Sequence, residues 1–566
     1  MRYDDRPWLK HYEARLSPEI SVPDVACADL LEGCFEDFPD RAAFHFMGVT
    51  RTFGELDACS RRFAAFLSDI GCGPGDVVGI SLPNIPEYMY AHAGALRAGC
   101  AATGVSPLLS AKELTHQLND AGVRVLVTLD TLFEKRFQKA RDKVPKLSHV
   151  VVANVADSLG GLKRTVGKIL KKIPTGKVVP VPGKTILTFP DLLRRYPAEG
   201  PQVSIRPEDT CLIQYTGGTT GLPKGTELTH RNLVANMHQY LSWLGADVER
   251  GKETYCSGFP FFHLAGLGVC MASMALGFTQ ILIPDPRNTR HICEEIARHR
   301  PTLMTNVPSL YQMLLETPEF KSLDFSSIKA CISGAAPFSV EAIQAYEAVV
   351  GEGKVLELYG MTEASPVLTM NPHRGRKKIG SVGVPIQSTW LKIVDLESGT
   401  REMPFGESGE IIAHGPQIMK GYYNQPEETA HALRELDGRQ WFYSGDIGKM
   451  DEDGYLYVVD RAKDMLIVGG FKVFSREAEE TLYEHPAVDY CAFVGVPNPD
   501  RPDSQRVKAV IQLKAAYRSR STEELETDIL GFCRENMAPY KVPKIVQFVD
   551  AIPLTSVGKV DKKALR

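Results

Sequence analysis

Apolar runs of the strand type alternate with amphipathic runs of the helix type through the first part of the chain. Residues 76–83 (DVVGISLP) and 123–129 (VRVLVTL) are short and mostly apolar, which predicts strands buried on both faces. Between them, residues 85–99 and 112–122 have the longer apolar periodicity of helices. Strands that alternate with helices build parallel sheets covered by helices. The N-terminal part is therefore predicted to be an α/β domain.

The same pattern returns later in the chain, where apolar strands run into turns that contain glycine or proline. These runs are residues 211–218, 280–284 and 329–337. In open α/β sheets, ligands bind beyond the carboxyl ends of the strands. The glycine-rich loop that follows the first of these strands is therefore in the right place for a binding site.

The pattern changes after about residue 385. Residues 389–395, 409–415 and 453–460 alternate or form hairpins, which predicts a smaller, twisted antiparallel sheet. A charged joint at 460–463 precedes strand-like runs and a helix at 521–536. A chain of 566 residues exceeds one ordinary core. We expect an N-terminal domain at 1–460 and a small α+β C-terminal domain at 461–566.

Composition indicates a globular protein that has no general attraction to nucleic acid. The formal net charge is −4, with 43% hydrophobic and 24% charged residues. The 12 cysteines show no zinc-type spacing, and residues 1–16 carry charges where a signal peptide would have an apolar core. These features predict a cytoplasmic location.

Two segments raise the question of a membrane. Residues 266–284 are uncharged, but Gly277 predicts a helix end followed by a strand, so a buried helix and strand are expected. Residues 162–177 (LKRTVGKILKKIPTGK) form a basic amphipathic pattern. A solvated surface helix is the favoured interpretation, and peripheral contact with the inner face of the membrane stays open.

Residues 215–230 (YTGGTTGLPKGTELTH) combine glycines, threonines and one lysine directly after a strand. Backbone amides and hydroxyls bind phosphate oxygens, and lysine neutralises their charge. A Walker A loop needs GxxxxGK before Ser or Thr, whereas Lys224 here lies between Pro223 and Gly225. The loop is predicted to hold a polyphosphate outside the P-loop class, with an ordinary turn as the alternative.

Four further stretches match the motifs of one family in the same order. They are ISGAAP at 332–337, LYGMTEASP at 358–366, the SGD…DRAKD…GGFKV run at 441–473, and PLTSVGKVDKKALR at 553–566. Together with the glycine loop they resemble the acyl-adenylate-forming superfamily of acyl-CoA synthetases, amino-acid adenylation domains and luciferases. The resemblance covers nearly the entire chain. Within it, bacterial long-chain fatty acid–CoA ligases are the most similar group, on the stretches 82–99, 106–122, 215–236, 359–372 and 380–395.

The resemblance implies a site for ATP and AMP. Tyr359 would stack on adenine, and Asp446 would accept hydrogen bonds from the ribose hydroxyls with help from Arg461. The implied nucleotide-binding residues are Thr216, Gly217, Gly218, Thr219, Thr220, Lys224, Gly334, Ala335, Ala336, Tyr359, Gly360, Met361, Asp446 and Arg461.

The resemblance also implies the catalytic groups. Lys559 would contact both the substrate carboxylate and the α-phosphate, and Thr362 would contact phosphate. Glu363 would hold Mg²⁺, since one carboxylate plus substrate phosphates is the usual way to bind this ion. Such groups neutralise the charge that develops when pyrophosphate leaves.

A second half-reaction with CoA is implied to need a swing of the C-terminal domain about Lys463. The swing would withdraw Lys559 and bring Gly470, Phe471 and Lys472 toward the site to meet CoA. Ser475 stands where relatives often have proline, and serine there is expected to be the N-cap of the next helix.

The acyl pocket is expected near FPFFHLAGLG, with His263, Gly266 and Gly268 as lining residues. Amino-acid-activating relatives carry an aspartate after this aromatic run to hold the α-amine, whereas this chain has no carboxylate there; the resemblance therefore implies a fatty or aromatic acid rather than an amino acid. The small residues Gly266 and Gly268 are expected to open a tunnel for an alkyl chain; the alternative is that they allow tight helix packing.

The favoured function is an AMP-forming acid–thiol ligase that joins medium- to long-chain fatty acids to CoA. One alternative is a stand-alone adenylating ligase for fatty or aryl acids that loads a carrier protein. A silent acyl- or nucleotide-binding protein is the other, and the presence of Lys559, Glu363 and Asp446 argues against it. A homodimer is left open.

Overall fold

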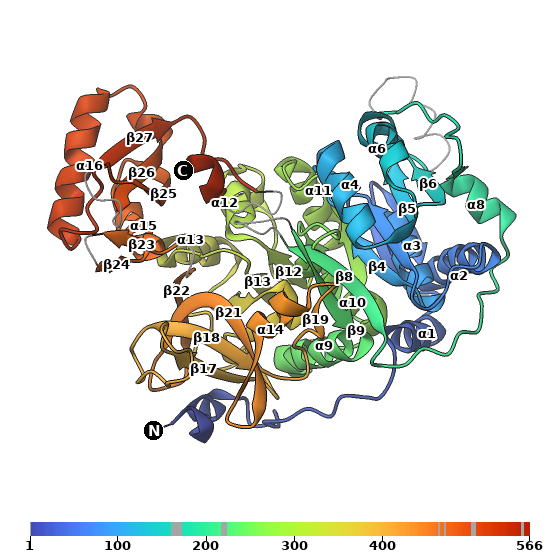
Figure 1. The fold of residues 1–566 in the computed structure, drawn as a ribbon, viewed down its shortest axis with the longest axis horizontal. Coiled ribbons are helices and arrows are strands. Elements are labelled where there is room, and N and C mark those ends of the chain that lie inside the picture. Colours follow the sequence, from blue (N-terminus) through green and yellow to red (C-terminus); the bar gives the residue numbers. More distant parts are fainter. Residues whose placement is uncertain are drawn as a thin grey trace.

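The computed structural model describes residues 2–159, 173–216, 223–461, 464–468, 471–499, 505–555 and 560–566. In these ranges, two mainly parallel sheets and one antiparallel sheet form the large N-terminal part. Figure 1 shows a small α+β part, coloured red, at one end of the molecule beside α12 (Pro308–Glu316) and α13 (Val340–Val350). The predicted fold class is therefore confirmed.

The first sheet carries the glycine-loop hairpin at one side. Its strand order is β19-β9-β8-β4-β3-β5-β6-β7. The strands are β3 (Val77–Ser81), β4 (Ala101–Gly104), β5 (Val123–Leu129), β6 (His149–Ala153), β7 (Thr185–Thr188), β8 (Thr210–Thr216), β9 (Lys224–Thr229) and β19 (Gly421–Tyr422). From β8 to β7 all pairs are parallel, whereas β9 pairs antiparallel with both β8 and β19. All five residues of β3 are buried, as its continuously apolar sequence predicts.

The second sheet has the order β16-β15-β14-β13-β12-β10-β11-β1-β2. Its strands are β1 (Ala42–Phe46), β2 (Val49–Thr52), β10 (Thr254–Ser257), β11 (Thr279–Leu282), β12 (Leu303–Asn306), β13 (Ala330–Ser333), β14 (Val355–Gly360), β15 (Val367–Met370) and β16 (Val384–Pro385). The strands from β11 through β10, β12 and β13 to β14 run parallel, so their carboxyl ends meet along one edge.

Helices connect and cover the two sheets. The longer ones are α1 (Cys27–Asp37), α2 (Phe53–Asp69), α3 (Pro86–Arg97), α4 (Ala111–Asp120), α8 (Phe189–Arg195), α9 (His230–Leu244), α10 (Leu264–Leu276) and α11 (Thr289–His299). Short helical turns are η1 (Tyr3–Asp5), η2 (Pro7–His11), α5 (Asp130–Leu132), η3 (Phe133–Phe137), α6 (Gln138–Ala140), η4 (Arg141–Lys143), η5 (Gly245–Asp247), η6 (Phe320–Ser322), η7 (Thr362–Ala364) and η8 (Ala515–Tyr517).

The apolar segment 266–284 forms a buried helix and strand, as predicted. Helix α10 ends at Gly277, which has a left-handed φ of 71°, and β11 follows directly. No helix in the described ranges has the length and hydropathy of a bilayer-spanning segment. Most of the basic segment 162–177 lies outside the described residues.

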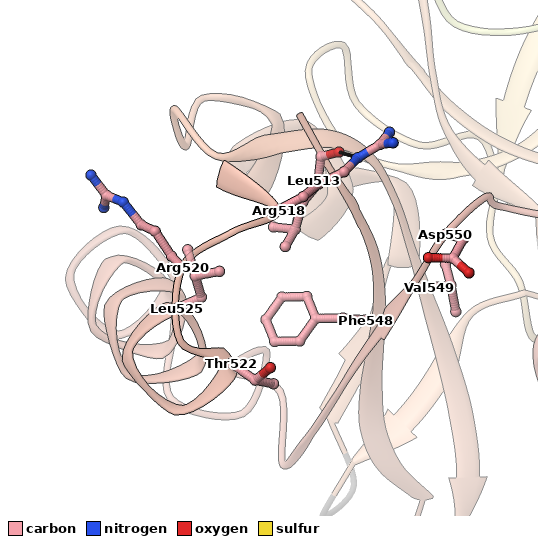
Figure 2. A pocket seen from close by; sticks show the side chains of 8 residues that line it. All are labelled: Leu513, Arg518, Arg520, Thr522, Leu525, Phe548, Val549 and Asp550. Atoms are coloured by element: carbon pink, nitrogen blue, oxygen red, sulfur yellow. Dashed lines mark hydrogen bonds between the residues drawn. The ribbon is translucent and has the colours of Figure 1, made fainter. Parts of the chain in front are cut away.

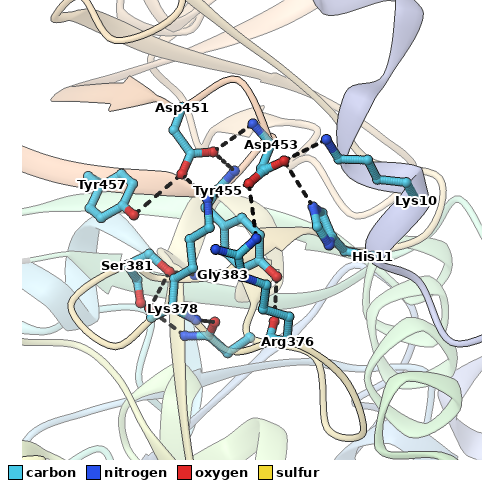
Figure 3. A network of polar contacts seen from close by, with 11 residues as sticks. Lys10, His11, Arg376, Lys378, Ser381, Gly383, Asp451, Asp453, Tyr455 and Tyr457 are labelled. Atoms are coloured by element: carbon cyan, nitrogen blue, oxygen red, sulfur yellow. Dashed lines mark hydrogen bonds and ion pairs between the residues drawn. The ribbon is translucent and has the colours of Figure 1, made fainter.

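The antiparallel sheet is assembled from β17 (Trp390–Val394), β18 (Gly409–His414), β20 (Leu433–Leu436), β21 (Arg439–Met450) and β22 (Leu456–Arg461), with α14 (Pro426–Ala432) before β20. The turn between β21 and β22 is tied to the N-terminal arm by a polar network (Figure 3). Lys10 Nζ lies 2.5 Å from Asp453 Oδ1, and Lys378 Nζ lies 2.6 Å from Asp451 Oδ2 and 2.8 Å from Asp453 Oδ2. The network fixes the sheet whose last strand leads to the C-terminal part.

The C-terminal part contains a hairpin and a three-stranded sheet with helices. Its elements are β23 (Leu466–Val468), β24 (Phe471–Val473), α15 (Ser475–Tyr483), β25 (Val488–Pro497), β26 (Gln505–Leu513), α16 (Thr522–Asn536), β27 (Ile545–Val549) and α17 (Lys562–Leu565). The helix predicted at 521–536 is α16. The expected N-cap role of Ser475 is wrong: Phe474 is the N-cap of α15, and Ser475 is already helical. The Asp460 carboxylate takes the capping role instead: it accepts from the Arg476 amide at 3.3 Å and from the Ser475 hydroxyl at 2.9 Å.

Candidate active site

The carboxyl ends of β13 and β14 bring two of the sequence motifs together. Ser333 pairs with Glu357 in parallel register, so residues 334–336, which follow β13, lie beside the last residues of β14. Ala335 has a left-handed φ of 67°. At Gly360, an added Cβ would lie 1.9 Å from the Pro366 carbonyl oxygen, so only glycine fits this turn. The two motifs therefore form one rigid edge.

Tyr359 and Asp446 meet at this edge from two different sheets. The Tyr359 hydroxyl donates to Asp446 Oδ2 at 2.8 Å, and the two residues are only 8% and 6% exposed. Asp446 lies on β21, where it pairs with Arg461 of β22. The structure thus brings together the residues predicted for adenine and for ribose. The direct bond between them was not expected from the sequence.

A second group of side chains lies around the start of β9. Lys224 is paired across the hairpin with Thr216, so both ends of the glycine loop are held by the sheet. Lys224 Nζ donates to Glu428 Oε2 of α14 and lies 5.1 Å from the centroid of the Tyr422 ring. Residues Gly217, Gly218, Thr219 and Thr220 lie outside the described residues.

Glu363 joins this group through Tyr422. The Tyr422 hydroxyl donates to Glu363 Oε1 at 2.9 Å, and the Met419 amide donates to the Glu363 carbonyl at 2.9 Å. Burial, followed by the Glu363 charge, raises the pKa of Tyr422, so this hydroxyl stays protonated and remains a donor. The hydrogen bond from Lys224 lowers the pKa of Glu428.

Tyr422 and Glu428 are residues that sequence reasoning missed. Both follow residue 420 and are about 200 residues from Lys224 in the chain. Only the antiparallel register of β19 against β9, which pairs Tyr422 with Thr226, brings them to the glycine-loop hairpin. The local spacing of residues in the sequence does not reveal a contact between positions so far apart.

The donor set around Glu363 fits a magnesium ion. Glu363 supplies one carboxylate, at a short turn directly after β14, and Thr362 is next to it. One carboxylate together with phosphate oxygens is the arrangement in which proteins usually hold Mg²⁺.

The three residues predicted for the acyl pocket differ in their surroundings. His263 is the N-cap residue of α10, with its ring 4.9 Å from that of Phe262. At Gly266, an added Cβ would lie 2.2 Å from the Pro260 carbonyl oxygen, so close packing explains this glycine. At Gly268 the nearest atom would be Pro366 Cδ, at an ordinary 3.6 Å. Gly268 thus has space beside the turn that follows Thr362, whereas the packing alternative holds for Gly266.

Most of the residues that the sequence predicts for the C-terminal part of the site lie outside the described residues of the structure. Lys463, Gly470 and Lys559 fall in undescribed ranges, and only the backbone of Arg461, Phe471 and Lys472 is described. Leu554 and Val560, on either side of the undescribed residues 556–559, are paired by an antiparallel bridge. Strands β23 and β24 pair antiparallel, with Val468 opposite Phe471.

The C-terminal part also has a separate surface hollow between α16 and β27 (Figure 2). Its lining residues are Leu513, Arg518, Arg520, Thr522, Leu525, Phe548, Val549 and Asp550. None of these was predicted for the site, and none is part of the groups around Tyr359 and Lys224.

The fold and the two side-chain groups define a nucleotide-binding site at the carboxyl edges of parallel strands. The family model of AMP-binding enzymes matches residues 31–423, and that of the AMP-binding enzyme C-terminal domain matches residues 477–559. The chain therefore belongs to the AMP-binding enzyme family.

Its relatives are similar over almost their whole length. The chain is 40% identical to a long-chain-fatty-acid–CoA ligase of Bacillus subtilis (strain 168), with 99% of this chain and 97% of the relative covered. It is 35% identical, with the same coverage, to a long-chain-fatty-acid–CoA ligase of Escherichia coli O6:H1.

Solved structures give the same result for the fold. The anthranilate CoA ligase AuaEII in complex with anthranoyl-AMP has a TM-score of 0.83 at 26% identity, covering 100% of this chain and 98% of that one. ATP-bound MatB from Rhodopseudomonas palustris has a TM-score of 0.79 at 27% identity, covering 95% and 98%.

Proposed function

We propose that the protein is an AMP-forming long-chain fatty acid–CoA ligase. In the first half-reaction, a carboxylate oxygen of the fatty acid attacks the α-phosphorus of ATP, and the bond to pyrophosphate breaks. In the second, the CoA thiol attacks the acyl carbonyl, its proton is lost, and AMP leaves. The similarity to long-chain-fatty-acid–CoA ligases over the full chain supports the substrate class.

The observation that carries this proposal is the pair of side-chain groups at neighbouring sheet edges. The buried Tyr359–Asp446 pair offers an aromatic ring and a carboxylate, which suit adenine and the ribose hydroxyls. The group of Lys224, Tyr422 and Glu363 offers a cation and a carboxylate on the side of the glycine loop. ATP combines an uncharged base with a polyphosphate, so its site needs both an aromatic environment and a cationic one.

In the proposed mechanism the chain positions two anions against each other. Asp446 holds the ribose, and Lys224 with the loop at 216–220 holds the β- and γ-phosphates. Thr362 contacts the α-phosphate, and Lys559 contacts it together with the substrate carboxylate. Mg²⁺, held by Glu363, would neutralise phosphate charge. The acyl chain extends past His263 and Gly268.

For the second half-reaction, we propose that the C-terminal domain, residues 461–566, turns about Lys463. The turn withdraws Lys559 and brings the backbone of Gly470, Phe471 and Lys472 to CoA. We also propose that the enzyme acts in the cytoplasm, with the basic segment 162–177 as the candidate for peripheral contact with the inner face of the membrane.

The test is pyrophosphate release with ATP and Mg²⁺ over fatty acids of graded length and benzoate, with and without CoA. The proposal expects turnover that requires CoA and peaks on long chains. Release of about one equivalent whether or not CoA is present would indicate a carrier-protein acceptor instead. If no acid gives release, ATP binding to wild type and to Lys559→Ala separates a silent binder from an enzyme with another substrate.

A further inference from the structure

A chain of buried polar side chains crosses from the end of β22 to the C-terminal segment. Ser475 is fully buried; its hydroxyl donates to Asp460 Oδ2 at 2.9 Å. Lys562 Nζ donates to the same hydroxyl oxygen at 2.5 Å and lies 2.8 Å from Glu479 Oε1. A hydroxyl has one proton to donate and lone pairs to accept, so Ser475 connects the acid to the lysine.

At one end of this series of side chains, Lys562 lies in the C-terminal segment that directly follows Lys559 in the sequence. Lys562 is three residues beyond Lys559 in the sequence, and the Leu554–Val560 bridge joins the described residues on either side of 556–559. The Asp561 amide donates to the Pro553 carbonyl at 2.8 Å, which strengthens the same connection. Lys562 therefore joins the base of the Lys559 loop to helix α15.

The other end reaches the ribose side of the site. Asp460 pairs with Ile447 in the β21–β22 hairpin, one position from the pair formed by Asp446 and Arg461. The same carboxylate accepts from the Arg476 amide at 3.3 Å, at the positive N-terminal end of α15. Asp460 precedes Lys463 in the chain and Ser475 follows it, so the contact spans the proposed hinge.

The electrostatics favour a charged lysine here. Lys562 is 17% exposed and Glu479 is 13% exposed. Burial alone would lower the pKa of Lys562, but Glu479 and Asp460 outweigh it and raise this pKa. A partly buried ammonium with two acids and a hydroxyl in range is held in one geometry, because losing a partner would leave a buried charge unpaired.

We propose that Ser475 and Lys562 are positioning residues for adenylation: they fix the Lys559 loop relative to the ribose-side hairpin. The proposal rests on the proposed function. Neither residue touches the reacting atoms, so each acts through the placement of Lys559. The thioester step proceeds with Lys559 withdrawn and does not depend on this contact.

The experiment measures the two half-reactions separately in the full-length Ser475→Ala and Lys562→Met variants. Acyl-AMP formation is followed with ATP and fatty acid, and thioester formation with supplied acyl-AMP and CoA. We expect kcat for acyl-AMP formation to fall about 10-fold to 100-fold, because small misplacements of a catalytic group have effects of this size. The KM for ATP and the thioester step should each change less than about twofold.

Matched variants separate positioning from general damage. Lys563→Met removes the neighbouring exposed lysine and should match wild type. Ser475→Thr keeps a hydroxyl and should recover most of the lost rate. If Lys562→Met does not fold, Ser475→Ala alone provides the test, with its thermal midpoint as the folding control.

Two results would overturn the positioning role while leaving the ligase function intact: an equal fall of both half-reactions, or no fall in either. A wild-type enzyme that forms no acyl-AMP from any fatty acid would overturn the proposed function, and the positioning role with it.

Discussion

The nucleoside side and the phosphate side of the proposed site are built in opposite ways. Tyr359 and Asp446 are 8% and 6% exposed and are bonded to each other. The side chains of Lys224 and Glu428 are 33% and 46% exposed, and they form an ion pair within the protein. The nucleoside side is thus a buried, preformed surface. The phosphate side is half-exposed, and its cation, Lys224, already has an ion-pair partner.

This difference teaches where binding free energy arises. A nucleoside meets groups that are already in position, so little ordering is lost on binding. In the proposed site, a polyphosphate replaces Glu428 as the partner of Lys224, and that exchange reduces the net gain in binding free energy. The phosphate side should therefore respond to changes in protein charge, and the nucleoside side to changes in shape and hydrogen bonding.

The largest effect is expected on the phosphate side, from Glu363→Ala. The change removes the only carboxylate that the proposal assigns to Mg²⁺, so kcat for pyrophosphate release should fall roughly 10²- to 10³-fold. A Mg²⁺ titration of the rate is the measurement. Tyr422→Phe, which leaves the carboxylate in place, is the control; an equal loss in both variants would contradict the assignment.

On the nucleoside side, Asp446→Ala should weaken ATP binding by about 10- to 100-fold, because a hydrogen bond to a charged group contributes about 1.5–3 kcal/mol. Calorimetric titration with a non-hydrolysable ATP analogue measures this. Asp446→Asn retains an acceptor and should lose less. Unchanged affinity in Asp446→Ala would show that the ribose is held elsewhere.

The burial of the nucleoside side can be tested through Glu357, which lies on the same strand as Tyr359. Burial raises the pKa of Glu357 to about 8, and the Gly380 amide donates to its Oε2 at 3.1 Å. Because the folded pKa is above the unfolded one, its contribution to stability is complete below about pH 4 and is lost as the pH rises toward 8.

Glu357→Gln should therefore flatten the fall in thermal midpoint between about pH 5 and 8. The pH series of thermal unfolding is compared with that of Glu352→Gln, an exposed acid nearby. Parallel slopes for wild type and Glu357→Gln would mean that this region is more hydrated than the structure indicates.

The smallest effect has the opposite sign. Glu428→Gln releases Lys224 from its ion pair, and ATP should bind about 1.4- to 5-fold more tightly, because exposed pairs contribute about 0.2–1 kcal/mol. The same titration measures it, with Glu427→Gln as the control on the same helix. Weaker binding in Glu428→Gln would mean that this acid supports the phosphate site rather than competes with it.

Much of the fold was visible in the sequence because the signals are local. The continuous apolar runs at 76–83 and 123–129 became buried parallel strands, and the left-handed Gly277 ended α10 as expected. The Ser475 N-cap was the local inference that failed. Serine is favoured at helix starts because its oxygen accepts from a backbone amide, but here the distant Asp460 carboxylate accepts from the Arg476 amide instead.

By itself, the sequence determined the α/β class, the order of the motifs, and the residue types at the sheet edges, because apolar periodicity and short motifs act within a few residues. Tertiary structure alone decided which side chains meet. Strand register brought Tyr422 to Lys224. The packing of sheets and helices brought Glu428 to Lys224, Asp446 to Tyr359, and Lys562 through Ser475 to Asp460. Such contacts join residues that are tens to hundreds of positions apart, and their formation depends on the packing of whole sheets rather than on any local preference.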